Sequence, residues 1–298
     1  MTSAAVLIVC GQSNAHGHGQ QLAPHDRLTT PLRNVFGLPR QFNQSLSRDR
    51  VVWRGYTSDG MNLGEEQDHT VCLATETARL WQAEVDAGNP RGLPDLYILQ
   101  ISIGAQGVTE RFMWYPDRPP RLKPGKLGTV DISLYPYTCH LLRLAFADLR
   151  AQGKQPVPLA LHWIGGEEEA GVPLTELTGL RSIYERLFQG FRAAIGQECP
   201  ILLYRDLSGN GVQRQGYALD SYFYVRGVFE ELAAAGPDIR IRSAADSPYW
   251  RDDAQDNGIF AEDCVHYTAD VQRWFARQAM ADAYARLLSV KNSGGAVR

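Results

Sequence analysis

Short runs of apolar residues alternate along this chain with longer segments in which apolar residues recur every three or four positions. The short runs are typical of strands that are buried on both faces. They lie at or within residues 4–10, 93–103, 157–164, 200–204 and 239–241. The longer segments are typical of helices with one apolar face. They lie at residues 70–85, 137–152, 174–195, 221–235 and 267–288.

This alternation of strands and helices predicts an α/β fold with a parallel central sheet and helices on both faces, which makes three layers, α/β/α. We expect a single domain over residues 1–290, because no linker divides the chain. Two polar segments rich in Gly and Pro, at about 17–68 and 111–134, are predicted to be long loop insertions. Residues 291–298 are predicted to form a flexible tail.

Composition narrows the class of protein. With 298 residues, 44% hydrophobic and 21% charged, the chain resembles ordinary globular proteins and neither a disordered chain nor a coiled coil. The 30 basic and 33 acidic side chains give a net charge of -3, so the basic footprint of a nucleic-acid binder is absent. No apolar run approaches the roughly 18 residues that a membrane span needs. We therefore expect neither nucleic acid nor a membrane as a partner, and the oligomeric state stays open.

The cysteines indicate reduced thiols. Their number is odd, and no spacing typical of a zinc site occurs. They are Cys10, Cys72, Cys139, Cys199 and Cys264. The first apolar run is also short and has no basic residue before it, unlike a signal peptide. We expect a cytoplasmic protein, and leave secretion or assembly into a larger particle open.

The first predicted strand ends in Gly-Gln-Ser-Asn at residues 11–14. A serine in a glycine-initiated turn after a strand is well placed for a nucleophile, because the turn exposes the hydroxyl and its N–H groups can stabilise an oxyanion. The alternative is that Ser13 only caps a helix. His16 and His18 follow closely; we expect them in a loop near the mouth of the site rather than on a metal, because the spacing indicates no third ligand.

A second candidate lies just before the last predicted helix. Asp263 and His266 are three residues apart, so one turn can bring both side chains to the same point. Serine needs a base to take its proton, and a carboxylate commonly orients a histidine that does so. Asp-x-x-His is common by chance, however, and alone it is equally compatible with a capping Asp beside a surface His.

Together these two segments resemble the SGNH or GDSL-like hydrolase superfamily, which has a flavodoxin-like α/β/α fold. More narrowly, they are similar to its sialate O-acetylesterase-like branch of carbohydrate acetylesterases, which opens with Gly-Gln-Ser-Asn and ends with Asp-x-x-His. The resemblance implies that Ser13 is the nucleophile, His266 the base and Asp263 its orienting carboxylate. It also implies that the enzyme needs no metal or other cofactor.

Two middle motifs extend the resemblance. Residues 105–109 resemble Ala-x-Gly-Gly-Thr, with Val108 in place of the second glycine, and Trp114 follows. This implies that the N–H groups of Ser13 and Gly107 form the oxyanion hole. Residues 163–169 resemble Trp-x-Gln-Gly-Glu-x-Asp, but Gly165 replaces the glutamine and Glu169 replaces the aspartate.

That replacement removes a side chain that is expected to line the oxyanion hole. Loss of one such donor costs about 10² to 10³ in rate. Either a backbone N–H, Gln106 or Gln12 substitutes for it, or the enzyme is slow on ordinary esters. A glutamine at position 165 would restore the donor, unless Gly165 holds a left-handed backbone that only glycine adopts easily.

Asn14, Trp114 and Glu167 are the candidate substrate-binding residues. Aromatic rings stack on sugars, although filling a core is their commoner role. The acidic run at 167–169 is equally compatible with a solvated turn.

The sequence thus predicts a serine esterase that removes O-acetyl groups from a carbohydrate, because the long loops are polar and suit a sugar better than a lipid. Two alternatives stay open: a lipase-like or thioesterase-like hydrolase, and a catalytically weakened carbohydrate-binding or structural module of the same fold.

Overall fold

The computed structural model describes residues 2–64, 68–124, 130–205, 219–251 and 258–294. Within them, a seven-stranded sheet has the order β3-β2-β4-β1-β7-β8-β9. All neighbouring strands are parallel except β3, which runs antiparallel to β2. The strands are β1 (Thr2–Gly11), β2 (Val35–Gly37), β3 (Arg54–Gly55), β4 (Asp95–Ser102), β7 (Lys154–Ile164), β8 (Ile201–Tyr204) and β9 (Ile239–Arg242).

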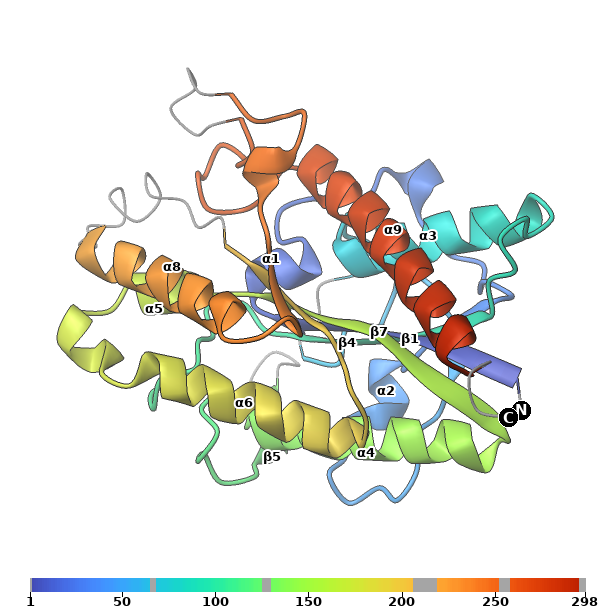
Figure 1. The fold of residues 1–298 in the computed structure, drawn as a ribbon, viewed down its shortest axis with the longest axis horizontal. Helices are drawn as coiled ribbons and strands as arrows, with labels where there is room; N and C mark the ends of the chain where they lie inside the picture. Colours follow the sequence, from blue (N-terminus) through green and yellow to red (C-terminus); the bar gives the residue numbers. More distant parts are fainter. Residues whose placement is uncertain (1, 65–67, 125–129, 206–218, 252–257, 295–298) are drawn as a thin grey trace.

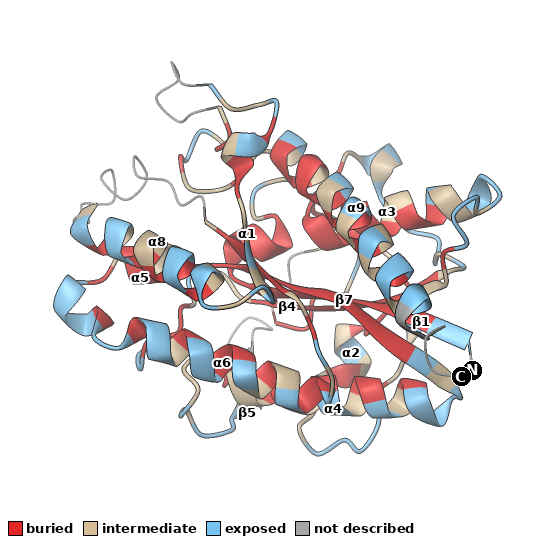
Figure 2. Ribbon diagram, viewed as in Figure 1, coloured by how far each residue is buried: buried red, intermediate tan, exposed pale blue. Residues whose placement is uncertain are grey.

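Helices cover both faces of this sheet (Figure 1). One face is covered by α4 (Leu134–Ala151), α6 (Leu180–Ile195) and α8 (Leu219–Ala234), and the other by α3 (Leu73–Asp86) and α9 (Ala269–Gly294). Side chains of β1 alternate between the two cores: Val6 and Ile8 pack under α4 and α6, and Leu7 and Val9 pack under α3 and α9. The sheet is buried along most of its length (Figure 2), and the predicted three-layer α/β/α class is confirmed.

The segment expected to be an irregular insertion at 17–68 contributes two strands to the sheet. β2 pairs with β4, and β3 pairs with β2. Runs of three and two residues are too short to give a periodic apolar pattern, so the sequence did not reveal them. The same segment holds the short helices η1 (Pro24–Asp26) and α2 (Arg40–Asn43). Within 111–134, β5 (Leu122–Pro124) and β6 (Val130–Ile132) form a separate antiparallel pair.

Two helix boundaries also differ from expectation. The helix predicted at 174–195 is divided into η3 (Leu174–Leu177) and α6, because Gly179 between them is left-handed, with φ 76°. The last helix, α9, continues to Gly294, so the flexible tail expected from residue 291 is wrong for residues 291–294. The rest of that tail lies outside the described residues, and the single-domain division stays a prediction.

Three further features bear on the sequence predictions. All five cysteines are buried and free of disulfides. No helix in the described ranges is long and apolar enough to cross a membrane. In the same part of the chain, no three His, Cys, Asp or Glu side chains gather closely enough to hold a metal ion.

Candidate active site

The ends of three neighbouring strands bring the candidate residues to one edge of the sheet. Gly11 at the end of β1 is in register with Ser102 of β4 on one side and with Ile164 of β7 on the other. The three strands therefore end side by side, and the residues that follow them lie at the same edge of the sheet. They are the short helix α1 (Ser13–His16), the loop that contains Gly107, and the short helix α5 (Glu167–Ala170).

The turn that presents Ser13 depends on a glycine. Gly11 has φ 139°, and a Cβ there would lie 1.9 Å from the carbonyl oxygen of Ile164. The N–H of Gln12 then donates to the same carbonyl oxygen at 3.0 Å. The chain leaves the sheet directly into α1, and Ser13 is the first residue of that helix, where a backbone N–H has no partner within the helix.

Asp263 and His266 form the pair that their spacing predicted. The Asp263 carboxylate lies 2.7 Å from Nδ1 of His266, and its other oxygen accepts the N–H groups of Val265 and His266 at 2.9 and 3.0 Å. Burial alone would raise the pKa of Asp263, but these hydrogen bonds outweigh it and lower that pKa. A carboxylate only accepts, so it keeps the proton on Nδ1 and leaves Nε2 as the acceptor.

Asn14 joins this pair to the serine turn. Its Nδ2 donates to the carbonyl of Val265 at 3.1 Å, and its Oδ1 accepts the N–H of Tyr267 at 2.9 Å. These two residues flank His266. In addition, Nε2 of Gln272 donates to the backbone carbonyl of Asn14 at 2.8 Å. The segment with the histidine is therefore fastened to the residue that follows Ser13.

This arrangement corrects the expectation that Asn14 binds substrate. Its side chain is only 1% exposed, and both its amide atoms have partners inside the protein, including Oε1 of Glu167 at 2.6 Å. Asn14 is a positioning residue.

His18 lies beside His266, the candidate base, a contact that the sequence did not predict. Its ring centre lies 4.5 Å from that of His266, at an angle of 41°. Its N–H donates to the carbonyl of Ser13 at 3.0 Å, which fixes it beside the serine turn. His18 therefore restricts the position of the His266 ring. The His-x-His spacing was visible in the sequence, but the partner lies almost 250 residues away.

Trp114 holds the Gly107 loop against β1. Its indole N–H donates to the carbonyl of Gly11 at 3.1 Å, and its backbone N–H donates to the carbonyl of Gly107 at 3.2 Å. The side chain is fully buried and packs edge-on against Trp163 and Phe191. The expectation that Trp114 stacks on a sugar is therefore wrong, because neither face of its ring reaches the surface.

Glu169 fixes the same loop from the other side. One carboxylate oxygen accepts the N–H of Val108, and a Cβ on Gly107 would lie 2.5 Å from that oxygen. A glycine is needed at 107 because the carboxylate approaches its backbone so closely. Among the described residues, the N–H groups of Gly107 and Ser13 donate to no other group.

Glu169 and Glu167 are both carboxyls in a poorly solvated place. Burial raises the pKa of Glu169 to about 7, although the N–H of Val108 opposes this. Burial also raises the pKa of Glu167, and the amide of Asn14 opposes it. Glu167 further accepts from Nε2 of Gln12. Each oxygen of Glu167 thus accepts from a side chain that builds the serine turn, and substrate binding by Glu167 stays a prediction.

The two candidate substitutes for the missing glutamine differ in their freedom. Nε2 of Gln12 is already donating to Glu167. Gln106 uses its Oε1 to accept the N–H of Met113 at 3.0 Å, which leaves its Nε2 without a partner among the described residues. Gly165 itself is not left-handed, and a Cβ there would make only ordinary contacts, from 3.5 Å outward. The backbone at position 165 would therefore accept a glutamine side chain.

Comparison with known proteins shows the fold. No family model and no curated protein matches the sequence. NanS aligns over 97% of this chain and 99% of its own, at 14% identity and a TM-score of 0.60. A protein from Arabidopsis thaliana aligns over 93% and 97%, at 14% identity and a TM-score of 0.56. A carbohydrate acetylesterase from Xanthomonas citri aligns over 95% and 57%, at 14% identity, but its TM-score of 0.46 is too low to carry an argument.

The chain therefore shares its α/β/α fold with NanS and with the Arabidopsis protein. At this low identity, the comparisons leave its branch and its activity open.

Proposed function

We propose that this protein is a serine esterase that removes O-acetyl groups from a carbohydrate. The observation that carries the proposal is the pair of hydrogen bonds from Asn14 to the residues on either side of His266. They tie the segment that contains His266, whose Nδ1 is hydrogen-bonded to Asp263, to the residue that follows Ser13. Ser13, His266 and Asp263 are the residue types of a Ser-His-Asp triad, and the proposal gives them those roles.

In the proposed reaction, Oγ of Ser13 attacks the acetyl carbonyl and its proton passes to Nε2 of His266. The tetrahedral oxyanion is held by the N–H groups of Ser13 and Gly107, with Nε2 of Gln106 as a third donor. The C–O bond to the sugar then breaks, and His266 returns the proton to the departing sugar oxygen. Water attacks the acetyl-enzyme with the same base, and acetate leaves.

Each remaining polar group has a part in holding this geometry. Asp263 keeps the proton of His266 on Nδ1, and its negative charge stabilises the imidazolium that forms. Glu167, through Gln12 and Asn14, holds the serine turn. Glu169 and Trp114 hold the loop with Gly107. The proposal needs no metal or organic cofactor, and a cytoplasmic location stays a prediction.

The test uses p-nitrophenyl acetate and p-nitrophenyl octanoate with the parent, Ser13→Ala and the exposed control Ser47→Ala. We expect turnover of the acetate ester, its loss in Ser13→Ala, and no change in Ser47→Ala. Preference for the octanoate ester would favour a lipase-like enzyme. Turnover of neither ester by a folded parent would favour a non-catalytic module and end the esterase proposal.

A further inference from the structure

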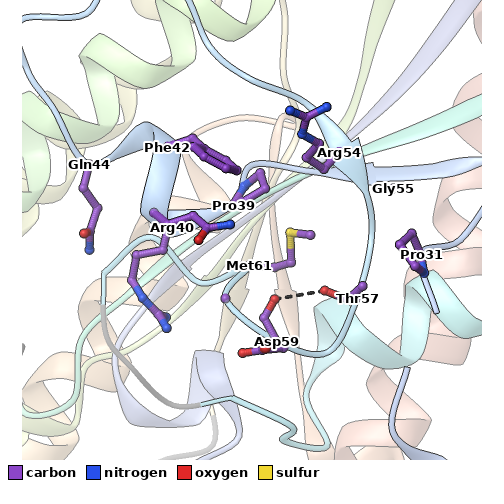
Figure 3. A pocket seen from close by; sticks show the side chains of 12 residues that line it. Pro31, Pro39, Arg40, Phe42, Gln44, Arg54, Gly55, Thr57, Asp59 and Met61 are labelled. Carbon is purple, nitrogen blue, oxygen red and sulfur yellow. Dashed lines mark hydrogen bonds between the residues drawn. The ribbon is translucent and has the colours of Figure 1, made fainter. Parts of the chain in front are cut away.

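A pocket of about 500 Å³ lies beside the outer edge of the sheet, away from the residues that the proposed reaction uses (Figure 3). It is formed by α2, by β3 and by the turn that follows β3. Its volume lies within the range of about 300 to 1,000 Å³ that is typical of small-molecule sites. Nothing in the proposed chemistry accounts for it.

The lining combines an aromatic ring, apolar surface and hydrogen-bonding groups. Phe42 is half-buried, and the exposed guanidinium of Arg54 lies 5.7 Å from its ring centre. Arg54 has no ion-pair partner among the described residues. Met61 lies in the middle of the pocket, and Thr57 and Asp59 lie at its lower side (Figure 3). A sugar ring offers apolar C–H faces and a rim of hydroxyls, which matches this mixture.

One wall of the pocket is held in place before any ligand arrives. The guanidinium of Arg40 donates to Asp68 at 2.9 Å and to the carbonyl of Asn62 at 3.0 Å. Asp68 accepts the N–H of Gly60 at 2.8 Å, and the N–H of Arg40 donates to the carbonyl of Gly60 at 2.7 Å. These bonds join α2 to the turn that follows β3. A site that is already ordered loses less entropy on binding.

One side of the pocket is joined to the end of β4, the strand beside the serine turn. Asn62, next to the pocket residue Met61, bonds both the N–H and the carbonyl of Ser102, each at 3.0 Å. Ser102 is in register with Gly11, which precedes the serine turn. Only β4 stands between β2 and β1, which gives a sideways separation of about 10 Å at the usual strand spacing. Gly37 at the end of β2 is in register with Ile98, four residues before Ser102, so the end of β2 is also set back along the strands by about 13 Å from the serine turn.

We infer that this pocket binds a second sugar unit of the substrate, so that the enzyme acts on an acetylated oligosaccharide rather than on a free sugar. The inference rests on the proposed esterase function. A chain whose acetylated unit lies at Ser13 would extend past the end of β4, with a ring further along the chain against Phe42 and its hydroxyls towards Arg54, Thr57 and Asp59. Binding at such a remote site contributes to kcat/KM for the chain and not for a small ester.

The experiment compares the parent with Arg54→Ala and with Phe42→Ala/Arg54→Ala. Arg50→Ala is the matched control, because Arg50 is an exposed arginine of the same segment that does not line the pocket. The substrates are p-nitrophenyl acetate and chemically O-acetylated mono- and oligosaccharides, from both neutral and acidic sugars. Calorimetry with the unmodified oligosaccharides measures binding separately.

We expect the parent to favour an oligosaccharide ester over its monosaccharide ester. The double variant should lose about 10-fold or more in kcat/KM on the oligosaccharide, and Arg54→Ala a smaller factor. Both variants should keep the parent rate on p-nitrophenyl acetate, and Arg50→Ala should keep it on every substrate. We also expect the pocket variants to bind the unmodified oligosaccharide more weakly than the parent does.

The inference is overturned if the parent shows no preference for oligosaccharide esters, or if the variants match the parent on them. These results leave the turnover of p-nitrophenyl acetate intact, so they differ from failure of the esterase proposal, in which no ester is hydrolysed. In that second case, loss of oligosaccharide binding in the pocket variants would still identify a carbohydrate site.

Discussion

At the scale of single residues, the positions that differ most from a typical esterase triad site are at the oxyanion hole. Gly165 contributes no side chain there, whereas Gln106 has an amide Nε2 without a partner among the described residues. The other candidate, Gln12, has its amide occupied by Glu167. Gln106 is therefore the better substitute donor.

We predict that Gln106→Ala lowers kcat on acetyl esters by about 10² to 10³, the usual effect of losing one oxyanion donor. The melting temperature should change little, because Gln106 is only partly buried in a loop. Steady-state kinetics and thermal melting measure the two effects. Gly165→Gln should fold, since a Cβ there has only ordinary contacts. A fast Gly165→Gln variant beside an unchanged Gln106→Ala would show that the hole is incomplete instead.

Asp263 offers a second test at this scale. In Asp263→Asn the side-chain oxygen can still accept the two backbone N–H groups, so the turn should persist. The amide that replaces the other oxygen can donate towards Nδ1 of His266, which moves the proton of the imidazole to Nε2. We predict that kcat falls by about 10³ to 10⁴ while the far-UV spectrum and melting temperature stay the same. Glu262→Gln, next to it, is the control.

At the scale of the elements, the turn between β1 and α1 explains why the motif begins with glycine. Gly11 has a positive φ, and a Cβ there would overlap the carbonyl of Ile164. Gly165 does not have a positive φ, and a Cβ there would make only ordinary contacts. The two glycines lie on neighbouring strand ends, so they form a matched pair for testing backbone strain.

We predict that Gly11→Ala lowers the free energy of unfolding by about 3 kcal/mol or more, because β1 and β7 must separate to admit the methyl group. Gly165→Ala should change it by less than about 1 kcal/mol. Denaturant titration of both variants measures this. Equal stability of the two would contradict the account of the turn.

The short helix α5 carries a further prediction through Glu169. Its folded-state pKa of about 7 lies above the ordinary value of 4.5, so the folded protein binds this proton more tightly than the unfolded chain does. The stability from this group is fully present below pH 4.5 and is lost as the pH rises through 7. The slope approaches about 1.4 kcal/mol for each pH unit between these values.

Glu169→Gln keeps an oxygen for the N–H of Val108 but cannot ionise. We predict that the parent loses stability relative to this variant between pH 4.5 and 7.5, by a few kcal/mol. Glu167 and Glu168 repel an ionised Glu169, so the difference between the two proteins measures Glu169 together with its repulsion by these two carboxyls. The free energy of unfolding is measured by urea titrations at several pH values. If it changes with pH in the same way for both proteins, the pKa of Glu169 is not raised in the folded state.

At the scale of the whole molecule, the candidate site joins the two ends of the chain. Asn14 follows the first strand, whereas Val265 and Tyr267 precede the last helix, and the packing of α9 against α3 brings them together. The position of the Asp263–His266 pair consequently depends on the packing of the last helix on the sheet.

We predict that Asn14→Ala loosens this join, because the N–H of Tyr267 and the carbonyl of Val265 both lose their partner on the Asn14 side chain. Each buried group left without a partner costs about 1 to 3 kcal/mol. Hydrogen exchange of residues 263–267 should become faster and kcat should fall, with a modest decrease in melting temperature. Gln272→Ala, which removes a bond to the same residue from the other side, should produce a weaker form of the same effect. Unchanged exchange at 263–267 would contradict the join.

The sequence by itself determined the alternation of strands and helices, because burial on two faces or on one leaves a pattern within a few residues. It also indicated the Asp-His pair, since the two residues are three positions apart. It indicated the residues of the serine turn as well, although Ile164 and Glu167, far along the chain, hold that turn in place.

Tertiary structure alone decided what depends on distant partners. The pairing of β2 and β3 rests on β4, and their two or three residues are too short to leave a pattern. Trp114 was expected at the surface, yet the carbonyl of Gly11 and two aromatic rings enclose it. Asn14 and Glu167 were expected to face substrate, yet they satisfy each other and the segment around His266. Local sequence sets which groups a residue offers, and only packing sets which of them are already occupied.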